Sequence, residues 1–188
     1  MTIGADDPRV MEAVSEVLKA EGIVIVPCDT MYGIVGAVPE SERRIRLAKG
    51  RGEDKPFLQL IADVSWIRSF SDTPISPKLL KYWPGPLTIV IRIRAGDTLA
   101  VRVPGSPFLI RLITGLGKAI YSTSVNRAGT PPLSRIEEIR AEFGGDVDLI
   151  VDAGDLPQGV ASTIVDSTQR PAKILRQGSL IITPADLE

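Results

Sequence analysis

The chain has 188 residues, of which 44% are hydrophobic and 24% charged, so it is long enough to bury the core of one globular domain. It has no histidine and a single cysteine, Cys28, which excludes Ser-His-Asp and Cys-His catalysis, histidine-ligated metals and an intrachain disulfide. A net charge of −1 with 5% aromatic residues does not indicate a nucleic-acid-binding protein.

Hydrophobic periodicity predicts alternating helices and strands, with no internal repeat or linker. Asp7 and Pro8 are expected to cap and start a first helix, and Ser41 to cap a basic helix that ends at Gly50. Later helices are expected at 64–70, 77–82, 107–116 and 135–143. Strands are expected at 23–28, 34–38, 57–62, 87–94, 98–103, 119–123, 149–151, 163–166 and 174–175. This order predicts a single α/β domain over residues 1–188, with a twisted mixed β-sheet and flanking helices.

The N-terminal ten residues are acidic, and the longest apolar runs are only as long as a strand. Neither a signal peptide nor a bilayer-spanning helix is therefore predicted. We expect a cytoplasmic protein with no membrane partner.

The turn PCDTMYG, residues 27–33, follows a buried strand, which is where open α/β sheets commonly bind ligands. Thr30 offers a hydroxyl group, Asp29 a carboxylate, and Gly33 leaves room for a ligand. The alternative is a polar turn capped by Asp29. Without a histidine, Cys28 is expected to be a small buried side chain rather than a nucleophile.

Lys49 and Arg51 stand at the expected end of the basic helix, and residues 42–55 carry six cations and three carboxylates. Two cations on an accessible turn fit a polyphosphate or a carboxylate. The alternative is a solvated basic helix whose positive charges are favourable at its C-terminal end.

The segment 122–132 follows an apolar strand, and its first five residues, 122–126, carry three hydroxyl groups and an amide. Ser122, Ser124 and Asn126 would point the same way in an extended chain, which suits a polar ligand. The alternative is an ordinary polar loop. Neither a Walker loop nor a GxGxxG motif is present, so these residues indicate an anionic-ligand cleft and no particular reaction.

Seven short motifs follow one another along the chain. They are PCDTMYG (27–33), KGR followed by KP (49–56), WPGPLT (83–88), VRVP (101–104), SVNRAG (124–129), STIVD (162–166) and ILRQG (174–178). In this order they resemble the YrdC-type domain family, the threonylcarbamoyl-AMP synthases, over residues 23–178. No single motif is specific to this family, but the occurrence of all seven in this order is strong evidence for it. Because the sequence stops soon after ILRQG, it resembles the short form of the family.

The resemblance implies a YrdC-like fold with a basic concave face. It also implies an enzyme that condenses L-threonine, bicarbonate and ATP to threonylcarbamoyl-AMP and releases pyrophosphate. A partner complex then transfers the threonylcarbamoyl group to an adenosine next to the tRNA anticodon. The family's catalytic residues would be Lys49, Arg51, Ser124 and Asn126. Threonine would be bound by Thr30, Arg102 and Ser122, and ATP by the catalytic four together with Thr98, Ser162 and Arg176.

Chemistry of this kind needs no imidazole, because phosphoryl-type transfer depends mostly on positioning and charge stabilisation. Lys49 and Arg51 would neutralise the phosphates, while Ser124 and Asn126 would orient the α-phosphate and the carbamate. Arg102 would pair with the threonine carboxylate. Mg²⁺ would arrive with ATP, so no protein metal site is expected.

The sequence departs from the family pattern at three positions. Cys28 replaces a usual Thr or Ser, Ala128 replaces a usual Ser, and Leu60 stands where some members have a threonine-contacting His. Three other functions stay open. They are an RNA-binding, translation-associated YrdC/YciO-like module without stand-alone catalysis, a YciO-type relative of unknown activity, and an enzyme that uses carbamoyl phosphate. The four intact catalytic positions argue against the second of these, and the lack of an appended domain argues against the third.

Overall fold

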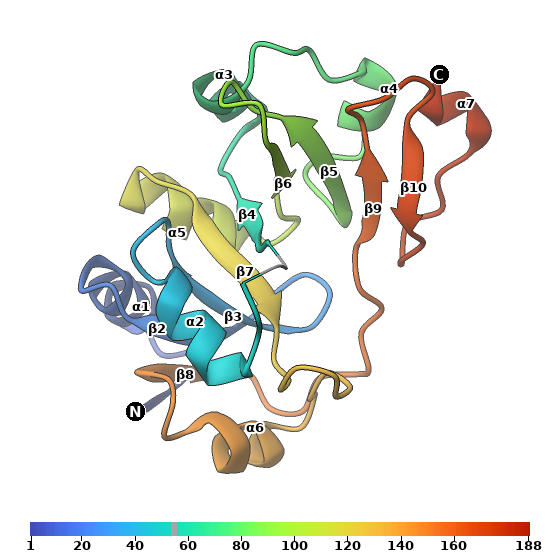
Figure 1. The fold of residues 1–188 in the computed structure, drawn as a ribbon. Coiled ribbons are helices and arrows are strands. Elements are labelled where there is room, and N and C mark those ends of the chain that lie inside the picture. Colours follow the sequence, from blue (N-terminus) through green and yellow to red (C-terminus); the bar gives the residue numbers. More distant parts are fainter. Residues whose placement is uncertain (54–55) are drawn as a thin grey trace.

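Ten strands form one mixed sheet in the computed structural model, which describes residues 1–53 and 56–188 (Figure 1). They are β1 Thr2–Gly4, β2 Ile23–Pro27, β3 Tyr32–Ala37, β4 Leu58–Leu60, β5 Leu87–Arg92, β6 Thr98–Arg102, β7 Ile120–Ser124, β8 Leu149–Asp152, β9 Thr163–Asp166 and β10 Lys173–Arg176. Across the sheet the order is β1-β8-β2-β3-β7-β4-β6-β5-β9-β10. The neighbours β1–β8, β8–β2, β4–β6 and β5–β9 are parallel and the others antiparallel, so the predicted mixed sheet is confirmed.

Seven α-helices flank the sheet in the part of the chain that the structure describes. They are α1 Val10–Lys19, α2 Glu42–Lys49, α3 Ile67–Phe70, α4 Pro77–Leu80, α5 Pro107–Leu116, α6 Ile136–Phe143 and α7 Pro184–Leu187, with a 3-10 turn at Val64–Trp66 before α3. Among the described residues, no helix combines the length and the apolar character that crossing a membrane requires.

The half of the sheet that contains β8, β2, β3 and β7 is covered on both faces (Figure 1). Successive residues of a strand point to opposite faces, so one strand contributes to two cores. Val24 and Val26 pack with α1 and α5, whereas Ile23 and Ile25 pack with α2 and α6. Burial on both faces explains why the run from Ile23 to Val26 is continuously apolar.

The other half, which contains β6, β5 and β9, is covered on one face. Leu87, Ile89 and Ile91 of β5 pack into a third core with residues from α3, α4 and the C-terminal segment. Thr88 alternates with them and faces the opposite side, where no helix among the described residues covers the sheet and where it forms the wall of a cavity.

Several local expectations differ from the structure. The first helix begins at Val10 and not at Pro8, because the Asp7 carboxylate accepts the Arg9 backbone N–H at 2.8 Å in a turn that precedes the helix. Ser41 precedes α2 as expected, but its hydroxyl donates to the carbonyl oxygens of Glu21 and Gly22 rather than capping the helix. The strand β1 and the helix α7 were not predicted, since three or four residues carry too little periodicity.

Candidate active site

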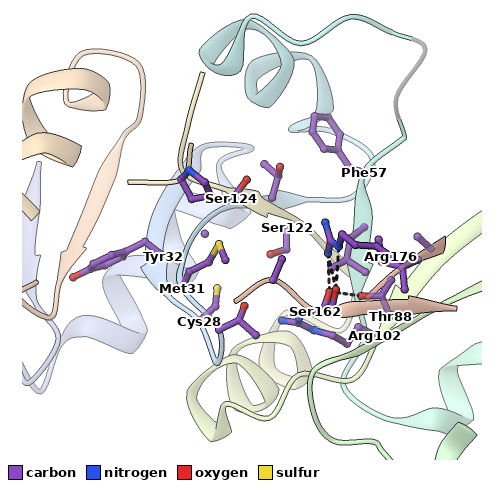
Figure 2. Close-up of a pocket in the computed structure, with 18 of the residues that line it drawn as sticks. Cys28, Met31, Tyr32, Phe57, Thr88, Arg102, Ser122, Ser124, Ser162 and Arg176 are labelled. Atoms are coloured by element: carbon purple, nitrogen blue, oxygen red, sulfur yellow. Dashed lines mark hydrogen bonds between the residues drawn. The ribbon is translucent and has the colours of Figure 1, made fainter. Parts of the chain in front are cut away.

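A cavity of about 320 Å³ lies where the two halves of the sheet meet (Figure 2). The β2–β3 turn, β7 and the segment around Phe57 form one side, and β5, β6, β9 and β10 form the other. Among the described residues that line it are three arginines, Arg51, Arg102 and Arg176, and no carboxylate. A cavity with this lining favours an anionic ligand.

Arg102 is the most deeply buried of these arginines, with 3% of its surface exposed. Its Nη2 donates to Asp29 Oδ1 at 2.7 Å, and Asp29 Oδ2 accepts the Gly105 backbone N–H at 3.1 Å. Its Nε is buried without an acceptor among the described residues. A buried donor that lacks an acceptor costs free energy, and a ligand carboxylate can supply one in the planar geometry that suits arginine.

A second group of polar side chains lies across the cavity from the β2–β3 turn (Figure 2). The Arg176 guanidinium donates to the Ser162 carbonyl at 2.8 Å, and the Ser162 and Thr88 hydroxyl groups are 2.9 Å apart. Partial removal of water, and then the charge on Arg102, lower the pKa of Arg176. Two like charges that repel each other across a small space are relieved when an anion binds between them.

Lys49 lies behind the cavity wall and not in it, at the end of α2. Only 3% of its surface is exposed, and its ammonium donates to the carbonyl oxygens of Ser124 and Asn126 at 2.5 and 2.7 Å and to Asn126 Oδ1 at 2.9 Å. The Ser124 hydroxyl donates to the same Asn126 Oδ1 at 2.6 Å. Burial, and then the charges of Arg51 and Arg127, lower the pKa of Lys49 to about 8. The ammonium therefore organises the turn that carries Ser124 and Asn126.

The Arg51 side chain lines the cavity and lies against the aromatic ring of Phe57. Its guanidinium lies 4.6 Å from the centre of the buried Phe57 ring, and its Nη2 donates to the Pro56 carbonyl at 2.9 Å. Arg46 lies over the same ring at 4.9 Å. The ring thus gives Arg51 a fixed support at the rim, where stacking of a cation on an aromatic face is favourable.

Cys28 forms part of the wall near Ser122 and Gly33. Burial raises the pKa of its thiol to about 12, so the thiol is neutral at physiological pH, in line with its expected role as a small packed side chain. A Cβ on Gly33 would stand 2.8 Å from Cys28 Sγ. Glycine at this position therefore leaves the room that the thiol occupies.

Comparison with known proteins places this arrangement in a family. A profile of the Sua5/YciO/YrdC family, described as "Telomere recombination", matches residues 16–178. The chain belongs to this family. The match covers all of the residues that the seven motifs span.

Individual Sua5/YciO/YrdC proteins agree with that assignment. The threonylcarbamoyl-AMP synthase of Bacillus subtilis is 30% identical over 95% of this chain and 56% of its own length. The structure of Pyrococcus abyssi Sua5 complexed with L-threonine has a TM-score of 0.81 at 29% identity, over 90% of this chain and 54% of that one. The chain thus spans about half the length of both proteins. Escherichia coli YciO, at 24% identity, has a TM-score of 0.82 over 95% of each chain and shows the shared fold alone.

Most of the residues expected to form the Sua5/YciO/YrdC site come together in the structure. The cavity is lined by Thr30, Arg51, Arg102, Ser122, Ser124, Ser162 and Arg176. Lys49 and Asn126 join it through Ser124, as described above. Asn126 does not continue the row of Ser122 and Ser124, because β7 ends at Ser124 and the chain then turns toward Lys49.

Other expected positions lie apart from the cavity. Thr98 is exposed and does not line it; strand alternation places it on the same face of β6 as Ala100 and Arg102, two positions farther out. Leu60 is fully buried in the core beneath α1 and α5, and it is Leu58 of β4 that lines the cavity. Lys55 of the Lys-Pro pair is outside the described residues.

Three contributors to the site were not singled out from the sequence. Thr88 is a polar residue at a buried position of the otherwise apolar run Leu87–Ile91, and that break in the pattern is a usable signal. Phe57 carried no signal, since a single aromatic residue is ordinary in a core. Arg127 carried none either, because its hydrogen bonds to Ala48 and Glu142 come from the separate helices α2 and α6.

Proposed function

We propose that this chain condenses L-threonine, bicarbonate and ATP to threonylcarbamoyl-AMP and releases pyrophosphate. The observation that carries the proposal is the cavity that joins Arg51, Arg102 and Arg176 with small hydroxyl groups and excludes carboxylates from its described lining. Such a site suits substrates that bring a carboxylate and several phosphates together. The L-threonine bound to Pyrococcus abyssi Sua5 and the name of the Bacillus subtilis relative support the same substrates here.

The reaction needs two bond-forming steps. The threonine amine and bicarbonate form a carbamate and water. A carbamate oxygen then attacks the α-phosphorus of ATP, and the bond from that phosphorus to the bridging oxygen breaks, so that pyrophosphate leaves with the electron pair. Negative charge grows on the phosphate oxygens, and fixed cations lower the barrier by stabilising it.

In this proposal the cavity holds two neighbouring subsites. Arg102, with Ser122 and Thr30, binds the threonine carboxylate and side chain, because Arg102 has a buried donor without an acceptor. Arg51 and Arg176 neutralise the phosphates from the other sides. Ser124 and Asn126 orient the carbamate and the α-phosphate, and Lys49 supplies positive charge while it holds that turn in place.

The remaining parts come from outside the cavity. Mg²⁺ would arrive with ATP and would neutralise part of the negative charge on its phosphates. Thr98 stays a prediction for the outer part of the nucleotide. A mixed anhydride of a carbamate and AMP is labile, so we place a threonylcarbamoyl-transferase complex and its tRNA immediately downstream, in the cytoplasm.

The test is pyrophosphate release from ATP by the purified chain, with threonine and bicarbonate omitted in turn. Release that requires both, with a labile AMP conjugate as the product, is the expected result. Arg51→Ala should abolish most of it, whereas Arg94→Ala, at an arginine paired with Asp72 outside the cavity, should not. No release in any combination would contradict the proposal, and salt-sensitive RNA binding in its place would support the non-catalytic alternative.

A further inference from the structure

Arg127 makes four hydrogen bonds and one cation–π contact beside the site, although it does not line the cavity. Its guanidinium stacks on the Phe143 ring of α6 at 4.5 Å. It donates to the Glu142 carboxylate at 2.6 Å, the Glu142 carbonyl at 2.7 Å and the Asp146 carboxylate at 2.8 Å. Its Nη1 also donates to the carbonyl oxygen of Ala48 in the last turn of α2. One side chain thus connects α2, α6 and the loop that follows β7.

The loop held by Arg127 is the one that carries Ser124 and Asn126. Next to Arg127, the Ala128 N–H donates to the Lys49 carbonyl at 2.8 Å. The Asn126 amide donates to the carbonyl oxygens of Arg127 and Thr130, at 2.9 and 2.7 Å. These bonds fix the carboxamide with its Oδ1 toward Lys49. Arg127 and Lys49 therefore clamp opposite ends of one short turn against the end of α2.

We propose that Arg127 is a positioning residue, which holds the loop after β7 against the end of α2 so that Ser124, Asn126 and Lys49 keep their mutual geometry. The role rests on the proposed function only in the consequence for catalysis. Arginine suits the position because its planar fork can donate to several acceptors at once while one face stacks on Phe143. Lysine retains the positive charge but lacks the planar guanidinium group that donates to several acceptors at once.

The electrostatic surroundings of Lys49 offer a readout that simple loss of stability would not change. The charged groups that lower the pKa of Lys49 are Arg51, just beyond α2, and Arg127, from the loop after β7; burial acts in the same direction and is the largest cause. Removal of the Arg127 charge should therefore raise the pKa of Lys49. The alkaline decline of activity should move to higher pH in Arg127→Gln and stay in place in Arg127→Lys.

The kinetic test compares Arg127→Gln, Arg127→Lys and a matched control, Arg135→Gln. Arg135 is exposed, and its ion pairs among the described residues are both at 3.8 Å, so its substitution removes a surface arginine beside the same helix. We expect Arg127→Gln to lower kcat for pyrophosphate release about tenfold to hundredfold, with the KM for threonine within twofold of wild type, because small displacements of catalytic groups are costly. Arg127→Lys should recover part of the loss. A kcat within twofold of wild type in Arg127→Gln would overturn the proposal.

Residue-resolved hydrogen exchange tests the same clamp without reference to activity. The amide of Ala128 should exchange at least tenfold faster in Arg127→Gln and at the wild-type rate in Arg135→Gln. Unchanged exchange at Ala128 would overturn the positioning role, even if activity fell. If the wild-type protein releases no pyrophosphate, the proposed function fails and the exchange measurement still decides the role of Arg127. If Arg127→Gln does not fold, Arg127→Lys carries both measurements: a smaller loss of kcat and faster exchange at Ala128 are then expected, and wild-type values of both would overturn the proposal.

Discussion

Successive side chains point to opposite faces in both halves of the sheet, but the second face is packed in one half and borders the cavity in the other. Around β2 and β3, both sets of alternate residues are apolar and both faces are covered by helices. Around β5 and β6, one set is apolar and covered, and the other set includes Thr88 and Arg102 and borders the cavity. The site therefore exists because one sheet face was left without a helix, and hydrogen bonds and ion pairs replace packing there.

This contrast predicts that stability depends mainly on the doubly covered half. Leu18→Ala on α1, where the side chain is 1% exposed, should cost about 2–5 kcal/mol of unfolding free energy, because it leaves a cavity in the core. Ile164→Ala on the uncovered face should cost about 1 kcal/mol, since that side chain is only half-buried. Chemical denaturation measures both, and equal losses would contradict the contrast.

Substrate binding, in contrast, should depend mainly on the face that no helix of the described residues covers and that carries Thr88 and Arg102. Arg102→Ala should raise the KM for threonine about tenfold to hundredfold, because a hydrogen bond to a charged group contributes about 1.5–3 kcal/mol. Arg94→Ala, in the same half but paired with Asp72, serves as the control and should leave this KM unchanged. An unaltered KM in Arg102→Ala would remove Arg102 from the threonine subsite.

The pH dependence of activity should report on Lys49, where the two halves meet. The pKa of Lys49 is about 8, and the neutral amine has one donor fewer for its three oxygen partners. Activity should be half-maximal near pH 8 and fall about tenfold per pH unit above it.

The stability contributed by Lys49 should change in the opposite direction. Its pKa is lower in the folded chain than in the unfolded chain, so the unfolded chain binds more protons between about pH 8 and 10.5. The contribution of Lys49 to the free energy of unfolding therefore rises with pH in that window. Activity that stays constant to pH 9.5, or that falls only where the chain unfolds, would contradict the role of Lys49.

The smallest expected effect concerns the hydroxyl pair on the uncovered face. Thr88→Val removes the 2.9 Å contact with Ser162 and should raise the KM for ATP about fivefold, equivalent to about 1 kcal/mol. Thr168→Val removes a hydroxyl that bonds Asp166 outside the cavity and should have no effect on this KM. Equal KM values in the two variants would show that the pair does not support nucleotide binding.

Local sequence patterns predicted those helices and strands whose bounds depend only on the residues within them and next to them. The helix Pro107–Leu116 and the strand Thr163–Asp166 have the predicted bounds, because turn residues and apolar periodicity mark both ends. The end of α2 at Gly50 was also predicted, and Gly50 adopts there the left-handed conformation that favours glycine. The order of the motifs named the expected site residues, and seven of them line one cavity.

The sequence alone thus determined the α/β class, most element bounds to within about two residues, and the polar segments that follow strands. The tertiary structure decided that Arg102 is buried and not exposed, as a strand arginine usually is. It also decided that the Lys49 ammonium donates its hydrogen bonds to Ser124 and Asn126, and that Arg127 connects three separate segments. Periodicity encodes which face a residue takes within its own element, whereas a hydrogen bond between residues about 75 positions apart depends on where two elements pack.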